Sequence, residues 1–157
     1  MAKKGYTFEY EMDKSLGLMW DYHFRIPDAR TMRGYGIMQT NKVPADFCGC
    51  KDGLFHLLEC KQTKERSIRY SRLADHQEEA LNKVNSVGGI GLIAVNFHNG
   101  ERTKLKKIDR TFLLDVAQWS LFKDLNPNRK SITMDYFINR GKELILKRVG
   151  KSRLWVV

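Results

Sequence analysis

An Asp-Gly pair at residues 52–53 constrains the fold of this chain more than any other local feature. It separates two extended apolar runs, residues 44–51 and 54–61. Asp-Gly between such runs is the strongest short-range signal for a β-hairpin with a two-residue turn. The sequence therefore predicts that the two runs are neighbouring antiparallel strands.

The position of the turn also predicts which residues face one another across the hairpin. If Lys51 pairs with Leu54, counting back along both runs places Asp46 opposite Glu59. Lys61 shares the face of Glu59 because side chains alternate along a strand. One face of the hairpin is thus expected to carry two carboxylates and an ammonium group.

Opposed carboxylates such as Asp46 and Glu59 destabilise a strand pair unless something neutralises them. A hard divalent cation would do so, and Mg²⁺ takes one or two protein carboxylates together with waters and phosphate oxygens. Such a site suits phosphodiester hydrolysis, with Lys61 stabilising charge or positioning the attacking water. The alternative is a surface hairpin whose exposed face is simply charged.

The composition favours a nucleic-acid partner. Lys and Arg total 28 of the 157 residues and Asp and Glu total 18, so the formal net charge is +10. A surplus of this size favours phosphate binding, although ribosomal and membrane-binding proteins are also basic. The length fits one domain, residues 1–157, and the apolar fraction of 42% excludes a wholly disordered chain.

Cysteine usage and hydropathy indicate a cytoplasmic, intracellular protein that does not bind membranes. Three cysteines form an odd set, which fits a reducing compartment. The longest apolar run, residues 87–95, is too short to span a bilayer, and the first residues show no targeting pattern. Cys48, Cys50, Cys60 and His56 invite a zinc interpretation, but their spacing lacks the paired ligands of structural zinc sites. The predicted hairpin also places Cys48 on the face that carries Asp46. His56 and Cys60 would point to the opposite face.

Periodic apolar residues predict two helices within the first 87 residues. Residues 7–20 carry Glu9, Met12, Leu16 and Trp20 at steps of three and four, which places Glu9 at the edge of a buried stripe.

The second helix is expected to be capped by Ser71 and to run to Val87. Gly88-Gly89 then supplies the signal that ends it. Gln77 would point toward the sheet, and His76 would face DNA or solvent.

The rest of the chain is predicted to complete one α/β unit. Residues 90–97 form a near-continuous apolar run, typical of a strand buried on both faces, and residues 98–101 supply a turn. Residues 102–110 would form a strand that shows Lys104 and Lys106 on one face, as a phosphate track or as a solvated edge. Residues 111–125 would form a third helix. Trp119, Trp155 and the aromatic pair at 136–137 are expected in the core or an interface.

The pattern formed by Asp46 and Glu59-Cys60-Lys61 resembles the catalytic motif of the PD-(D/E)xK nuclease superfamily. The wider chain is similar to Holliday junction resolvases of the archaeal Hjc and bacterial RecU type. The further segments that carry this resemblance are residues 4–9 (K-G-Y-T-F-E), Arg25, Thr63-Lys64, Asp75-His76-Gln77, residues 88–90 with 94–97, residues 129–132 and residues 136–138.

The resemblance implies an α/β protein with a restriction-endonuclease-like core, a mixed central β-sheet flanked by helices. It implies an endodeoxyribonuclease that resolves four-way DNA junctions by paired symmetric nicks and acts as a homodimer. Asp46, Glu59 and the Cys60 carbonyl would hold Mg²⁺, for which Mn²⁺ could substitute. Catalytic roles fall to Glu9, Asp46, Glu59, Lys61 and Gln77, and DNA contacts to Lys4, Arg25, Arg30, Arg33 and Lys64.

The chain departs from the archaeal type between Arg25 and Asp46, where it is longer. Residues 26–43 contain basic residues and glycines, and we expect either a short basic stalk that contacts DNA or a disordered surface loop. Two other functions stay open. One is a nuclease of the same superfamily that acts on flaps or duplex DNA, and the other is a non-catalytic basic DNA-binding module. A cellular or a viral origin fits the sequence equally well.

Overall fold

A seven-stranded mixed sheet forms the centre of the protein. The computed structural model describes residues 4–27, 42–100 and 107–157. The strand order is β1-β2-β3-β5-β6-β8-β9, in which β3 and β5 are parallel and the other described neighbours are antiparallel. The strands are β1 (Tyr22–Arg25), β2 (Phe47–Lys51), β3 (Leu54–Thr63), β5 (Ile90–His98), β6 (Asp109–Asp115), β8 (Lys142–Val149) and β9 (Ser152–Val156).

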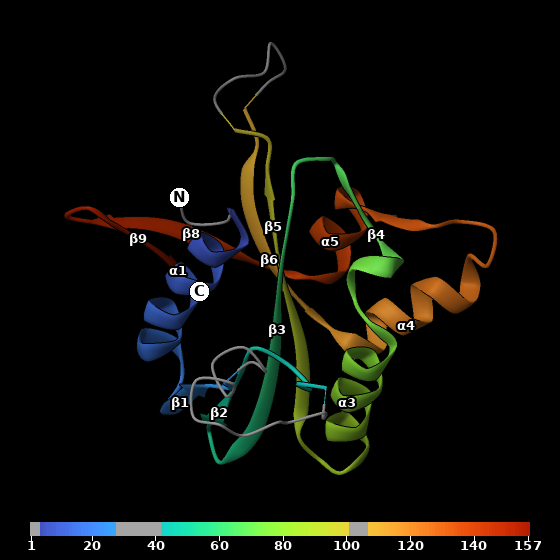
Figure 1. Ribbon diagram of the computed structural model, residues 1–157, viewed down its shortest axis with the longest axis horizontal. Coiled ribbons are helices and arrows are strands. Elements are labelled where there is room, and N and C mark those ends of the chain that lie inside the picture. Colours follow the sequence, from blue (N-terminus) through green and yellow to red (C-terminus); the bar gives the residue numbers. More distant parts are fainter. Residues whose placement is uncertain (1–3, 28–41, 101–106) are drawn as a thin grey trace.

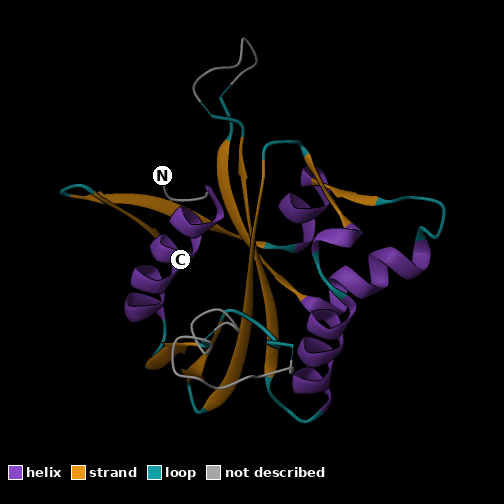
Figure 2. Ribbon diagram, viewed as in Figure 1, coloured by secondary structure: helices purple, strands orange, loops and turns teal. Residues whose placement is uncertain are grey.

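Helices cover both faces of this sheet (Figures 1 and 2). Helix α1 (Lys4–Met19) packs on one face, and α3 (Asp75–Ser86), α4 (Val116–Leu125) and α5 (Met134–Arg140) lie on the other. A small antiparallel sheet of β4 (Ser67–Arg69) and β7 (Ser131–Thr133) flanks the second group, followed after β4 by the 3₁₀ turn η1 (Tyr70–Arg72). The predicted fold class, a mixed central sheet flanked by helices, is confirmed.

The hairpin of β2 and β3 has the predicted register. Asp52 and Gly53 both adopt positive φ, 52° and 75°, as the favoured two-residue hairpin turn requires. Lys51 pairs with Leu54, and the pairing continues to Phe47 opposite Leu58. A local turn preference therefore set the register of the strand that carries the candidate site.

Helix α1 confirms the predicted stripe. Met12, Leu16 and Trp20 are buried against Leu58 and the same face of the sheet, and Glu9 is half-buried at the edge of the stripe. The helix begins at Lys4, three residues before the predicted start at residue 7.

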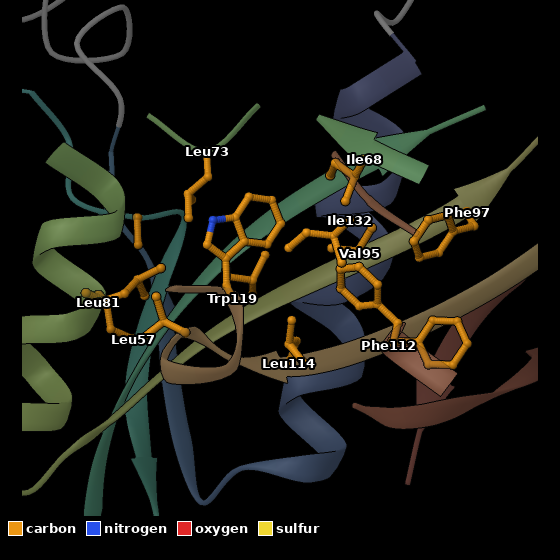
Figure 3. Packing of buried hydrophobic residues seen from close by; sticks show 14 of the residues in the cluster. Leu57, Ile68, Leu73, Leu81, Val95, Phe97, Phe112, Leu114, Trp119 and Ile132 are labelled. Carbon is orange, nitrogen blue, oxygen red and sulfur yellow. The ribbon is translucent and has the colours of Figure 1, made fainter. Parts of the chain in front are cut away.

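The larger core lies between the sheet and the second group of helices (Figure 3). Trp119 of α4 is fully buried there and meets the ring of Tyr70 edge-on at 6.3 Å. Trp155 is buried in the core under α1. Both tryptophans are packing residues, as predicted, because neither ring is exposed to stack on a base.

The predicted helix over residues 111–125 is wrong in its first part. Residues 109–115 form strand β6, which pairs with β5 and β8, and α4 begins only at Val116. Thr111-Phe112 fits a strand through its β-branched and aromatic side chains. Asp115 is the N-cap of α4, since its side chain accepts a 2.8 Å bond from the Ala117 amide.

The predicted cap at Ser71 is also wrong. Ser71 lies in the turn η1, and α3 begins at Asp75 after an extended Leu73-Ala74 segment. Burial of Leu73 in the core, with 2% of its surface exposed, holds this segment away from a helical path.

The strand predicted at residues 90–97 is confirmed as β5, which lies between β3 and β6. Residues 102–106 of the predicted basic strand, with Lys104 and Lys106, and most of the predicted stalk, residues 28–41, lie outside the described residues. Within the described ranges, no helix combines the length and the apolar character that crossing a membrane requires.

Candidate active site on strand β3

Hydrogen bonds of its backbone and its side chain fix Asp46 immediately before β2. Its amide donates to the Leu58 carbonyl at 3.1 Å, and its carbonyl accepts from the Ile26 amide at 2.8 Å. Its side-chain Oδ2 accepts from the Cys60 amide at 2.8 Å. The carboxylate is therefore held against the middle of β3 with little freedom to move.

Glu59 is the most deeply buried acidic side chain of the site, with 2% of its surface exposed. Its Oε1 accepts hydrogen bonds from the Lys61 ammonium and, at 2.8 Å, from Gln77 Nε2. Its Oε2 is buried and has no hydrogen-bond partner within the part of the chain that the structure describes. A buried carboxylate oxygen without a partner is costly unless something binds it.

The environment of Glu59 disfavours its charge. Burial, and then the negative charge of Asp46, raise the pKa of Glu59 to about 7, while Lys61 and Gln77 act in the opposite direction. Asp46 and Glu59 are therefore close enough to repel one another. The two carboxylates meet the predicted requirement for a neutralising cation.

The two carboxylates could supply part of the coordination shell of a divalent metal ion. Among residues 4–27, 42–100 and 107–157, no three His, Cys, Asp or Glu side chains form a metal-binding group. Mg²⁺ is commonly held by one or two carboxylates and completes its shell with water and substrate oxygens. The unpartnered Oε2 of Glu59 beside Asp46 supplies such a partial set.

Glu9 approaches the same part of β3 from helix α1. The pKa of the Cys60 thiol is raised well above its ordinary value, first by burial and then by the charges of Asp46, Glu59 and Glu9. The Arg25 guanidinium pairs with the Glu9 carboxylate. The sequence predicts Arg25 as a DNA contact, and in the structure its guanidinium orients Glu9.

Gln77 reaches the site from the first turn of α3, as the sequence predicts. Its Oε1 accepts from the Ala74 amide at 3.2 Å and lies 3.4 Å from Lys61 Nζ, while its Nε2 donates to Glu59. His76 is half-buried and its Nε2 lies 3.1 Å from the Val43 carbonyl, so its ring contacts the segment before Asp46.

The cysteines are divided between two faces of the hairpin, as predicted. Cys48 packs in the core under α3, whereas Cys60 packs in the core under α1. His56 also lies toward α1, with its ring 5.1 Å from that of Trp20. A zinc site built from Cys48 and Cys60 would need ligands from opposite sides of the sheet.

The other predicted DNA contacts do not gather at the site within the described residues. Lys64 is exposed in the turn that follows β3. Lys4 begins α1, but its side chain lies outside the described residues, as do Arg30 and Arg33.

A basic pocket that no sequence pattern predicted lies at the C-terminal end of β3. This cavity of about 930 Å³ is lined by Thr63 and by residues of two distant segments, Arg69, Tyr70, Arg72, Arg129 and Lys130 among them. Both segments are visibly basic in the sequence, but only the pairing of β4 with β7 brings them together.

Comparison with solved structures shows the class of the fold. Hjc of Archaeoglobus fulgidus, a Holliday junction resolvase from an archaeal hyperthermophile, matches with a TM-score of 0.57 at 17% sequence identity. The match covers 88% of this chain and 95% of that one. The fold is therefore of the Hjc nuclease type.

A family model then gives the family. The model of RecU, Recombination protein U, matches residues 29–151, so the chain belongs to the RecU family. A search of curated proteins found no match. The resemblance to resolvases of the Hjc and RecU type is confirmed, and with it the predicted function of a Holliday junction resolvase, an endonuclease of DNA recombination.

Proposed function

We propose that this resolvase is a Mg²⁺-dependent endonuclease that cuts four-way DNA junctions through paired, symmetric phosphodiester hydrolysis. The observation that carries the proposal is the buried Glu59 carboxylate, which lies beside Asp46 with its Oε2 unpartnered in the described part of the chain. Lys61 and Gln77 bind its other oxygen. This grouping of charges suits the binding of a cation and a phosphate together.

Asp46, Glu59 and the Cys60 carbonyl would hold Mg²⁺, for which Mn²⁺ could substitute. The ion would supply Lewis-acid shielding of charge on the phosphate and activation of water. The bond from the Cys60 amide to Asp46 Oδ2 orients that carboxylate. Because both carboxylates are fixed by hydrogen bonds, the site needs little rearrangement to bind the ion.

Lys61 is the residue that we expect to act on the reacting phosphate. Its side chain is 15% exposed, so the ammonium lies at the border between the buried carboxylate and solvent. There it would stabilise negative charge on phosphorus and position the attacking water. Gln77 orients Lys61 and Glu59, and Glu9, held by Arg25, completes the acidic group.

Two symmetric nicks in one junction require two active sites, and a homodimer with twofold symmetry supplies them. Residues 1–157 would form a single nuclease domain that acts inside the cell. DNA contacts are assigned to Lys4, Arg25, Arg30, Arg33 and Lys64, with residues 26–43 as a basic stalk or loop. The net charge of +10 supports an interaction with the DNA backbone.

Cleavage of a synthetic four-way junction tests this function. Asp46→Asn and Lys61→Ala should each abolish Mg²⁺-dependent cleavage while junction binding stays largely intact. Asp52→Asn and Lys51→Ala are matched controls, since they remove the same charges from the turn end of the same hairpin. Cutting by either active-site variant at the wild-type rate would refute the assignment.

The choice of substrate separates the two other functions. Labelled junctions, flaps and linear duplexes of equal length should show preferred cutting of the junction, with nicks at symmetric positions on two opposing strands. Preferred cutting of flaps or linear duplexes would indicate a different nuclease of the superfamily. Binding without cleavage in Mg²⁺ or Mn²⁺, and without heat of metal binding in calorimetry, would indicate a DNA-binding module.

A further inference from the structure

The basic pocket is lined by four cations and one carboxylate. Arg69, Arg72, Arg129 and Lys130 border it together with Glu65. Arg69, Arg129 and Lys130 are exposed and form no ion pair with any described carboxylate. Hydroxyl groups of serine and threonine also line the cavity. Guanidinium, ammonium and hydroxyl donors with little opposing negative charge are typical of a site for phosphate groups.

The pocket begins on the face of β3 that carries the active-site residues. Thr63 lines the pocket and lies two residues beyond Lys61, so the two side chains share a face of the strand. Two residues of a strand span about 7 Å. Arg72 is tied to the strand between them, since its Nη2 donates to the Gln62 carbonyl at 3.0 Å. A chain of phosphates that passes the active site can therefore extend into the pocket.

The cations of the pocket lie on or next to the small sheet of β4 and β7, which is anchored in the core. Arg69 and Ser131 are paired in the ladder of β4 and β7, and the Tyr70 amide donates to the Lys130 carbonyl at 2.9 Å. Ile68 and Ile132 anchor these strands in the core, both almost fully buried. The backbone positions of the cations are thus fixed before any ligand binds, which lowers the entropic cost of binding.

We propose that the basic pocket binds backbone phosphates of the DNA strand next to the bond that is cut, with Arg69, Arg129 and Lys130 as the contacting cations. This inference rests on the proposed function, because it takes the Asp46, Glu59 and Lys61 group as the place of cleavage. The pocket holds one arm of the junction in register with the active site.

The test compares two double variants that lose the same charge. Arg69→Gln/Arg129→Gln removes two cations of the pocket, and Lys147→Gln/Arg148→Gln removes two exposed cations of β8. The pocket variant should bind a four-way junction roughly tenfold to a hundredfold more weakly at about 0.1 M salt, and its salt dependence should fall by about two phosphate contacts. The β8 variant should bind as the wild type does. Equal affinities for the two variants would overturn the proposal.

Ser71→Glu provides a second variant that keeps every arginine. It places a negative charge on an exposed lining residue of the pocket, and the same loss of affinity is expected. Thermal melting of each variant checks that the fold is retained. If the arginine variant unfolds, wild-type affinity of folded Ser71→Glu would overturn the proposal, and weakened binding would support it.

Junctions with a single neutral methylphosphonate locate the contact. In the wild type, replacement of a phosphate within a few nucleotides of the nick should weaken binding, and in the pocket variant the same replacement should cost nothing further. Equal effects in both proteins would place the contact elsewhere. If the wild type cuts no DNA, the proposed function fails, and the affinities still decide whether the pocket binds a DNA backbone.

Discussion

Gln77 Nε2 donates a 2.8 Å hydrogen bond to Glu59 Oε1, which joins the first turn of α3 to the middle of β3. The Oε1 atom of the same amide accepts from the Ala74 amide, which fixes the orientation of the side chain. Gln77 therefore accepts a hydrogen bond from the backbone amide that precedes α3 and also orients a buried carboxylate. The geometry of the candidate site depends on how α3 packs against the sheet.

Gln77→Ala should lower junction cleavage about tenfold to a hundredfold, the usual cost of removing a group that orients a metal ligand. The loss should appear partly as a higher Mg²⁺ concentration for half-maximal rate. Glu79→Ala, an exposed substitution on the same helix, is the control and should leave the rate unchanged. Identical Mg²⁺ titrations for Gln77→Ala and the wild type would exclude this orienting role.

The metal-free protein should become less stable as the pH rises from about 5 to 8. Burial raises the pKa of Glu59 to about 7 in the folded protein from an ordinary 4.5, so the folded state favours the protonated carboxyl. Protonation of Glu59 therefore contributes on the order of 3 kcal/mol to the free energy of unfolding. This contribution is fully present below pH 4.5 and is lost as the pH rises through 7.

Urea unfolding in EDTA at several pH values measures this dependence. Glu59→Gln should remove most of the loss between pH 5 and 8, because its side chain does not titrate. Mg²⁺ should restore stability to the wild type at pH 8, since a cation favours the charged carboxylate. A pH profile that is equally steep in Glu59→Gln would assign the effect to another group.

Gly49→Ala should destabilise the fold by about 3 kcal/mol or more, because the new methyl group has no space. A Cβ atom at Gly49 would lie 2.2 Å from the Tyr22 carbonyl oxygen and 2.9 Å from Trp20 Cε3. Strand β1 would have to move away from β2. At Gly17 in α1 the nearest atom would lie 3.7 Å away, so Gly17→Ala should instead stabilise by about 0.5–1 kcal/mol. Chemical denaturation of both variants tests the contrast.

Asp115→Ala should cost about 1–2 kcal/mol of stability through loss of the N-cap of α4. Asp115 Oδ1 accepts from the Ala117 amide and from Asn85 Nδ2, each at 2.8 Å, and so also joins α4 to the end of α3. Asp124→Ala removes an exposed carboxylate near the end of the same helix and should be close to neutral. Similar unfolding free energies for the two variants would contradict the capping role.

Local patterns in the sequence determined the hairpin, the first helix and the buried strand β5. The Asp52-Gly53 turn is a two-residue preference, so it set the register of β2 and β3 without help from the rest of the chain. The same alternation correctly divided Cys48 from Cys60 between the two faces. Where the prediction failed, at residues 111–115, apolar content fitted a helix and a strand equally well, and pairing with β5 and β8 decided between them.

The sequence predicted contacts between active-site residues that lie close together in the chain, but not contacts between residues that lie far apart in it. The sequence by itself determined that Asp46, Glu59 and Lys61 share one face, because a strand repeats every two residues. Only the tertiary structure decided that Arg25 holds Glu9 and that Gln77 binds Glu59. It also decided that Arg69 and Arg129 meet in one pocket. These contacts join segments far apart in the chain, and their positions follow from how helices and strands pack into the two cores, which no local periodicity encodes.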